Sequence, residues 1–164
     1  SLVGKSGSRG KDNAMNPFGG QFDATQLSRW ILTRAHPGWL GLAYRDHGPD
    51  WCELELPWRP DLIGDEAQPV LASGPIISLL DMAAGMAIWV ANGEFKPVAT
   101  LDLRVDYLRP SRAHSSVIGR VTCYRRTRSA AFVRGSAHDG DPSDPVAEMT
   151  GVFMTLDPAR MVAA

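Results

Sequence analysis

Apolar and polar residues recur along this chain with two different periods, and each period predicts a different kind of element. Apolar residues at helical spacing over residues 23–35 predict a short N-terminal helix that ends at Pro37-Gly38. Alternation with a period of two predicts strands, each with one buried and one solvated face. The predicted strands are 39–47, 51–58, 98–108, 116–126, 130–138 and 146–156.

The segment Ser73–Asn92, SGPIISLLDMAAGMAIWVAN, follows neither pattern because nearly every residue after Pro75 is apolar. Proline is favoured in the first turn of a helix, and a helix that is apolar on all sides is a buried helix. The segment is too short and too interrupted to predict a membrane span, and it contains the carboxylate Asp81. We therefore expect one long core helix, covered by a curled antiparallel sheet and closed by a second copy of the chain.

Asp81 is the main candidate for chemistry. An isolated ionised carboxylate is costly to bury, so such groups are normally paired or kept for a reaction. Ser78, Asp81 and Gly85 are three and four residues apart and share one helix face, which suits the wall of a cleft. The alternative interpretation is that Asp81 meets an arginine or backbone N–H groups of a neighbouring strand, and this stretch does not decide between the two.

The strand 98–108 has the clearest alternation, and it predicts which side chains face the core helix. The side chains expected to face it are Leu101, Leu103, Val105 and Tyr107. Those expected to point away from it are Thr100, Asp102, Arg104 and Asp106.

Composition narrows the class of protein. Apolar residues at 44% and charged residues at 21% suit one folded domain, which we place at residues 21–160. Residues 1–20 are expected to be a disordered tail or a cloning remnant. A net charge of −1 argues against nucleic-acid binding, and neither a signal peptide nor a membrane span is expected. Two cysteines without motif spacing indicate reduced thiols and a cytoplasmic protein, and four unclustered histidines predict no metal site.

Four segments carry a resemblance to a known family: LPWRPDLIG (56–64), SGPIISLLDMAAG (73–85), ATLDLRVDYLRPS (99–111) and YRRTRSAAFV (124–133). Through them the chain resembles the hotdog-fold acyl-CoA thioesterases of the phenylacetate-degradation (PaaI) type, relatives of 4-hydroxybenzoyl-CoA thioesterase. The resemblance implies an α+β fold in which an antiparallel sheet of five to six strands wraps around one long central helix, with a short N-terminal helix. It also implies a homodimer, or a tetramer built as a dimer of dimers.

The same resemblance implies hydrolysis of an acyl-CoA thioester to free acid and CoA, with CoA as part of the substrate and no other cofactor. It implies that Asp81 acts as nucleophile or general base and that the backbone N–H of Ser73 or Gly74 polarises the thioester carbonyl. Unpaired N–H groups at a helix N-terminus favour a developing oxyanion. The residues expected to bind substrate are Gln68, Ser78, Gly85, Arg109, Arg126 and Arg128.

The chain also departs from the family pattern. Relatives usually carry His-Gly-Gly before the helix, where this chain has Ala72-Ser73-Gly74 and then Pro75, which has no N–H. An alternative function is therefore a non-catalytic protein of the same fold that binds acyl-CoA or an aromatic ligand. A dehydratase or hydratase is less favoured, because those relatives typically pair a histidine with an acid and this core helix has no histidine.

Overall fold

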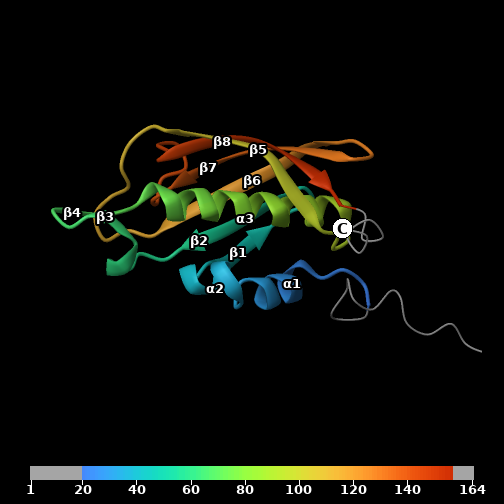
Figure 1. The fold of residues 1–164 in the computed structure, drawn as a ribbon, viewed down its shortest axis with the longest axis horizontal. Coiled ribbons are helices and arrows are strands. Elements are labelled where there is room, and N and C mark those ends of the chain that lie inside the picture. The colour runs from blue at the N-terminus through green and yellow to red at the C-terminus, as the bar shows by residue number, and fades with distance from the viewer. Residues whose placement is uncertain (1–19, 157–164) are drawn as a thin grey trace, which may run out of the picture.

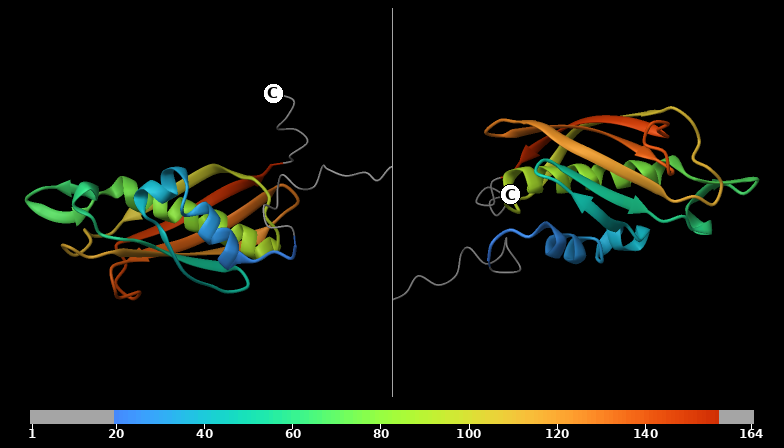
Figure 2. Two further views of the ribbon diagram at one scale, coloured as in Figure 1. Left: turned by 90° about the horizontal axis from the view of Figure 1, so that it is seen from below. Right: turned by 180° about the vertical axis from the view of Figure 1, so that it is seen from behind.

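The structure is a computed structural model that describes residues 20–156. The predicted tail, apart from Gly20, and the last four residues of the predicted domain lie outside the described residues. A curved antiparallel sheet wraps around one long helix, α3 (Ser73–Asn92), and two short helices lie along the side that the sheet leaves open (Figures 1 and 2). This is the α+β arrangement that the sequence predicts.

The sheet has six strands in the order β1-β2-β6-β7-β8-β5, and all neighbouring strands are antiparallel. The strands are β1 (Ala43–His47), β2 (Trp51–Leu56), β5 (Val98–Tyr107), β6 (Val117–Arg126), β7 (Ala130–His138) and β8 (Ala147–Thr155). The two edge strands are therefore β1 and β5. All six correspond to predicted strands, and their inward faces supply most of the core around α3.

The long helix α3 has the predicted bounds. Leu79, Leu80 and Met86 are fully buried, and the strands β2, β6 and β7 pack against the helix. Gly119 on β6 permits close packing, because a Cβ there would lie 3.0 Å from Leu79 Cγ. By length and composition α3 could cross a membrane, but its burial by the sheet identifies it as a core helix.

The N-terminal segment differs from its prediction. Helix α1 (Ala24–Ile31) is capped by Asp23, whose Oδ1 accepts from Thr25 N at 2.9 Å. A second helix, α2 (Ala35–Leu40), then follows where the sequence predicted the end of the first helix and the start of a strand. Proline is compatible with the first turn of a helix, so Pro37-Gly38 lies within α2 and does not end a helix. As a consequence β1 begins at Ala43 and not at residue 39.

Between β2 and α3, where the pattern predicted neither a strand nor a helix, the chain forms a short 3₁₀ turn and a hairpin. The turn spans Pro60–Leu62, and the hairpin pairs β3 (Ile63–Asp65) with β4 (Gln68–Leu71). In Figure 1 this hairpin projects beyond the N-terminal end of α3. A two-stranded hairpin is too short to show a clear alternation, so the pattern did not reveal it.

The predicted register of β5 is correct in its second half and wrong in its first. Leu103 and Val105 pack against the core, and the Tyr107 hydroxyl reaches α3, as predicted. A β-bulge between Thr100 and Asp102 reverses the faces before it. Thr100 therefore contacts α3, while the side chain of Leu101 is 59% exposed.

Candidate functional site

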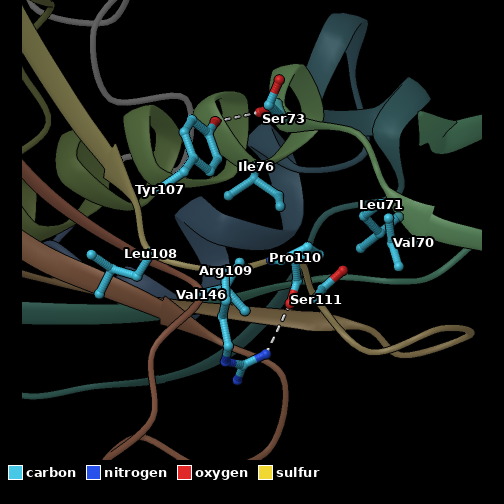
Figure 3. A pocket seen from close by; sticks show the side chains of 10 residues that line it. All are labelled: Val70, Leu71, Ser73, Ile76, Tyr107, Leu108, Arg109, Pro110, Ser111 and Val146. Atoms are coloured by element: carbon cyan, nitrogen blue, oxygen red, sulfur yellow. Dashed lines mark hydrogen bonds between the residues drawn. The ribbon is translucent and has the colours of Figure 1, made fainter. Parts of the chain in front are cut away.

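The N-terminus of α3 offers two backbone donors. Ala72, the residue before the helix, makes no side-chain cap. The N–H groups of Ser73 and Gly74 find no acceptor within residues 20–156, and Pro75 has no N–H. On the opposite side of the peptide, Tyr107 Oη donates to the Ser73 carbonyl at 2.8 Å (Figure 3). This bond ties the first turn of α3 to the end of β5, and so fixes the direction of the two free N–H groups.

The Asp81 carboxylate lies two turns further along α3 and is half-buried. Its Oδ1 accepts a hydrogen bond of 2.8 Å from Thr100 Oγ1 on β5. In the described part of the chain no Lys, Arg or His nitrogen lies within 4.0 Å of this carboxylate, and no backbone N–H donates to it. The alternative interpretation from sequence, a pairing with arginine or strand N–H groups, is therefore wrong for this copy of the chain.

Ser78 lies one turn before Asp81, and a histidine from another helix reaches it. His36 Nε2 on α2 lies 3.1 Å from Ser78 Oγ, and the His36 ring stacks on Trp39 with ring centroids 6.1 Å apart. The hydrogen bond joins α2 to α3 on the open side of the sheet. The sequence pattern gave His36 no role beyond its place among four unclustered histidines.

Two cavities flank the first turn of α3, one on each side of the Ser73-Gly74 peptide. The cavity toward β5 has a volume of about 360 Å³ and includes Ser73, Ile76 and Tyr107 in its lining (Figure 3). The cavity toward α2 has a volume of about 370 Å³ and includes Gly74 and Ser78. Both volumes fall in the range of small-molecule sites. A ligand atom bound at the free N–H groups would thus have one cavity on each side, and each cavity could hold one of its two substituents.

Arg109, expected to hold phosphate, is engaged by two carboxylates. Its Nη1 and Nη2 donate to Asp139 at 2.9 and 2.7 Å, and its Nε lies 3.1 Å from Asp144. The Asp139 side chain is fully buried, and Arg109 holds the pKa of that carboxyl at about 2, well below its usual range. The pair joins the end of β5 to the loop after β7, which is a structural task, although Arg109 also lines the cavity near Ser73.

The remaining predicted substrate-binding residues are spread along the molecule. Gln68 is exposed at the start of β4, on the projecting hairpin. Gly85 is buried, and a Cβ there would lie 3.9 Å from both Trp89 and Val98. Arg126 Nη1 donates to Asn92 at 2.9 Å at the C-terminal end of α3, and Arg128 is exposed in the turn after β6.

One chain therefore brings some predicted residues together and separates others. Ser73, Gly74, Ser78 and Arg109 lie around the N-terminal end of α3, with Asp81 about 12 Å further along the helix axis. Arg126 lies at the other end, about 28 Å from Ser73 along the axis.

Sequence reasoning missed Thr100, because the alternation in β5 gives no sign of a bulge. It also missed Ser111, a buried serine in the cavity toward β5. Neither cysteine competes with Asp81 as a nucleophile, because both are buried and burial raises the pKa of the Cys52 thiol to about 12.

The chain is similar in sequence and fold to several known proteins. Residues 69–146 match the family model described as the thioesterase superfamily. An Escherichia coli protein named medium/long-chain acyl-CoA thioesterase YigI is 33% identical over 86 residues, which are 44% of this chain and 56% of the relative. The chain thus spans little more than half the length of that curated relative.

Solved structures extend the similarity over most of the chain. A Pseudomonas aeruginosa protein of known crystal structure is 32% identical, with a TM-score of 0.73 over 81% of this chain and 98% of the other. The PaaI protein of the Escherichia coli phenylacetic acid degradation operon has a TM-score of 0.70 over 82% of this chain and 94% of its own. Its 14% identity supports the shared fold alone.

Proposed function

The chain belongs to the thioesterase superfamily, and from this premise we propose that it hydrolyses acyl-CoA thioesters with Asp81 as nucleophile or general base. The observation that carries the proposal is the state of the Asp81 carboxylate. It lies half-buried in an apolar helix, accepts one hydrogen bond from a neutral hydroxyl, and has no cation near it in the described residues. A carboxylate kept in such surroundings is typical of a reactive group.

In the general-base form of the reaction, Asp81 takes a proton from a water molecule. The water oxygen bonds to the carbonyl carbon, and the carbonyl oxygen becomes an oxyanion that accepts from the Ser73 and Gly74 N–H groups. Collapse of this intermediate breaks the carbon–sulfur bond, and the CoA thiolate leaves and is protonated. Thr100 holds Oδ1 of Asp81 and leaves Oδ2 to receive the proton. In the nucleophilic form, an Asp81 oxygen bonds to the carbonyl carbon, the carbon–sulfur bond breaks, and the CoA thiolate leaves and is protonated. Water then hydrolyses the mixed anhydride, which releases the free acid and restores the Asp81 carboxylate.

Helix geometry supports a site built from two copies of the chain. Ser73 and Asp81 lie eight residues apart, about 12 Å along one helix axis, whereas reacting groups must approach to about 3–3.5 Å. One chain cannot present both groups to the same carbonyl. We place Asp81 of one copy opposite Ser73-Gly74 of the other, with the two α3 helices antiparallel about a two-fold axis. That arrangement also brings Arg126 and Arg128 of one copy toward the N-terminal end of the partner helix, where CoA phosphates would need cations.

The edge strand β5 supports the homodimer. It is ten residues long, and only β8 pairs with it in the chain described here, so its outer edge carries unpaired backbone groups. Leu101 on β5 and Leu108, which follows the strand directly, are 59% and 56% exposed. Light scattering at micromolar concentration should give the mass of a dimer, or of a dimer of dimers, and a monomer mass would contradict the two-copy site.

A hydrolysis screen tests the activity. The purified protein is offered short, medium, long and aromatic acyl-CoAs with free thiol as the readout, after dialysis against a chelator because no metal or second cofactor is proposed. The name of the Escherichia coli relative makes medium and long chains the first choice. Release of CoA is the expected result. Binding of acyl-CoA without any turnover would favour the non-catalytic alternative, which the loss of the family's histidine and the proline at position 75 keep open.

We also propose that the protein is cytoplasmic, because its two cysteines are buried and form no disulfide.

A further inference from the structure

The cavity toward β5 is lined by apolar side chains, by Arg109 and by three residues with a hydroxyl group, and one of these hydroxyls has no partner within residues 20–156. Its walls include Leu71, Ile76 and Val146, all of which are buried core residues. Ser111 belongs to the same lining and is only 4% exposed. Its Oγ makes no hydrogen bond within residues 20–156. A buried hydroxyl without a hydrogen bond lowers the stability of the fold, and an apolar residue at this position would avoid that penalty. The presence of a serine therefore calls for an explanation.

The side chains around the Ser111 hydroxyl do not supply that reason. In Figure 3 the hydroxyl lies on the side of the cavity formed by Val70 and Leu71, and it is directed away from Arg109. Arg109 donates instead to the neighbouring Pro110 carbonyl at 3.0 Å and to Asp139. A trapped water needs two to four polar partners, and the side chains of Val70, Leu71 and Pro110 offer none, so a water there would depend on backbone groups alone. A ligand that enters the cavity can bring the missing partner.

The position of the cavity identifies the ligand. Ser73 lines it, and the proposed function puts the thioester carbonyl at the Ser73 and Gly74 N–H groups. The acyl chain can therefore extend from that carbonyl into the apolar cavity, where it meets Leu71 and Ile76 and then Ser111. An unsubstituted chain would bury the serine hydroxyl without a partner, whereas a chain that carries an oxygen would satisfy it.

We propose that Ser111 binds a hydrogen-bonding oxygen on the acyl group, so that the preferred substrates are hydroxylated or oxo acyl-CoA thioesters. This inference rests on the proposed thioester hydrolysis. A serine hydroxyl can both donate and accept, so either a hydroxyl or a keto oxygen fits the contact. Ser111 is thus a specificity-determining residue, and Asp81 and the helix N-terminus carry the reaction.

The test compares substrates of equal chain length. kcat/KM is measured for saturated, 3-hydroxy, 3-oxo and terminally hydroxylated acyl-CoAs, on the wild type and on Ser111→Ala. The wild type should prefer one oxygenated series by about tenfold or more, and Ser111→Ala should bring that ratio close to one. Ser115→Ala is the matched control, since its hydroxyl makes only a 3.4 Å contact with the Ala113 carbonyl outside the cavity lining, and it should keep the wild-type ratio.

The outcomes separate this inference from the proposed function. Hydrolysis of all series at equal kcat/KM by the wild type, or an oxygen preference that survives in Ser111→Ala, would overturn the role of Ser111 and leave the hydrolysis standing. If no thioester is hydrolysed, the proposed function fails. The comparison between oxygenated and saturated acyl groups is then made with the dissociation constants of the same CoA thioesters. Equal affinities in that measurement would also overturn the inference. If Ser111→Ala does not fold, a wild-type ratio close to one still overturns the inference.

Discussion

The carboxylates of Asp139 and Asp81 have contrasting surroundings in this protein. Asp139, in the loop after β7, is fully buried and accepts two hydrogen bonds from Arg109 and one of 2.6 Å from Arg112 N. Asp81, on α3, is half-buried and accepts one hydrogen bond from Thr100. The first carboxylate has its charge neutralised and most of its lone pairs used. The second has no cation beside it within residues 20–156, and its Oδ2 accepts no hydrogen bond there.

The difference shows how burial alone misleads. A buried carboxylate with a full set of charged partners holds segments together, and removal of one partner leaves an uncompensated charge. A carboxylate with one neutral partner holds little together and is available to a substrate. The number and the charge of the donors, more than the depth of burial, distinguish the paired Asp139 from Asp81, for which we propose a catalytic role.

The largest expected effect is on turnover and follows from replacing Asp81. Asp81→Asn keeps the shape and the acceptor for Thr100 but cannot attack a thioester or take a proton. kcat should fall by a factor of about one hundred or more, while the melting temperature changes little. Glu148→Gln makes the same change in charge on the exposed face of β8 and should keep wild-type turnover. Wild-type turnover in Asp81→Asn would remove Asp81 from the mechanism.

Replacing Asp139 should affect stability instead. Asp139→Asn leaves Arg109 with one acceptor fewer and without its buried counter-charge, and the free energy of unfolding should fall by about 3 kcal/mol. Urea denaturation followed by circular dichroism measures this. Asp144→Asn alters the 62% exposed partner of the same arginine and should cost less than about 1 kcal/mol. Equal losses in both variants would mean that burial does not distinguish the two ion pairs.

Low pH should weaken the Arg109–Asp139 ion pair and so lower the free energy of unfolding. The pKa of Asp139 is about 2 in the folded protein against 3.8 for a free side chain, because Arg109 stabilises the ionised form. The pair's contribution is therefore complete above pH 4 and is lost as the pH falls toward 2, by roughly 1–2 kcal/mol. Denaturation curves at several pH values should show this loss in the wild type and a smaller one in Asp139→Asn. A pH dependence that is identical in both proteins would contradict it.

The smallest expected effect concerns the hydroxyl that holds Asp81. Thr100→Val removes the donor with little change in shape, so Asp81 loses its fixed orientation. kcat should fall about tenfold with KM unchanged, and stability should change by less than about 1 kcal/mol. Thr100→Ser restores the hydroxyl and should restore kcat, whereas Thr150→Val on β8 should have no effect. A change confined to KM would show that Thr100 acts on substrate binding and not on Asp81.

The sequence by itself determined the main elements and the principal candidate for chemistry. The bounds of α3 and of β7 match the prediction, because a long apolar run after Pro75 and a clear alternation between turn residues are local signals. The lone carboxylate of an otherwise apolar helix was visible for the same reason. Resemblance to a family added the expected roles of Ser73 and Gly74 at the helix N-terminus.

Only the tertiary structure decided which groups meet. The β5 bulge that turns Thr100 toward Asp81 depends on pairing with β8, and Arg109 meets Asp139 because two loops 30 residues apart converge. Pro37-Gly38 lies inside α2 because the first turn of a helix does not need the proline N–H. The unpartnered Ser111 hydroxyl emerges only when the walls of its cavity are assembled. Local sequence fixes the period of an element, but contacts between distant segments depend on register and packing, which no short stretch of residues encodes.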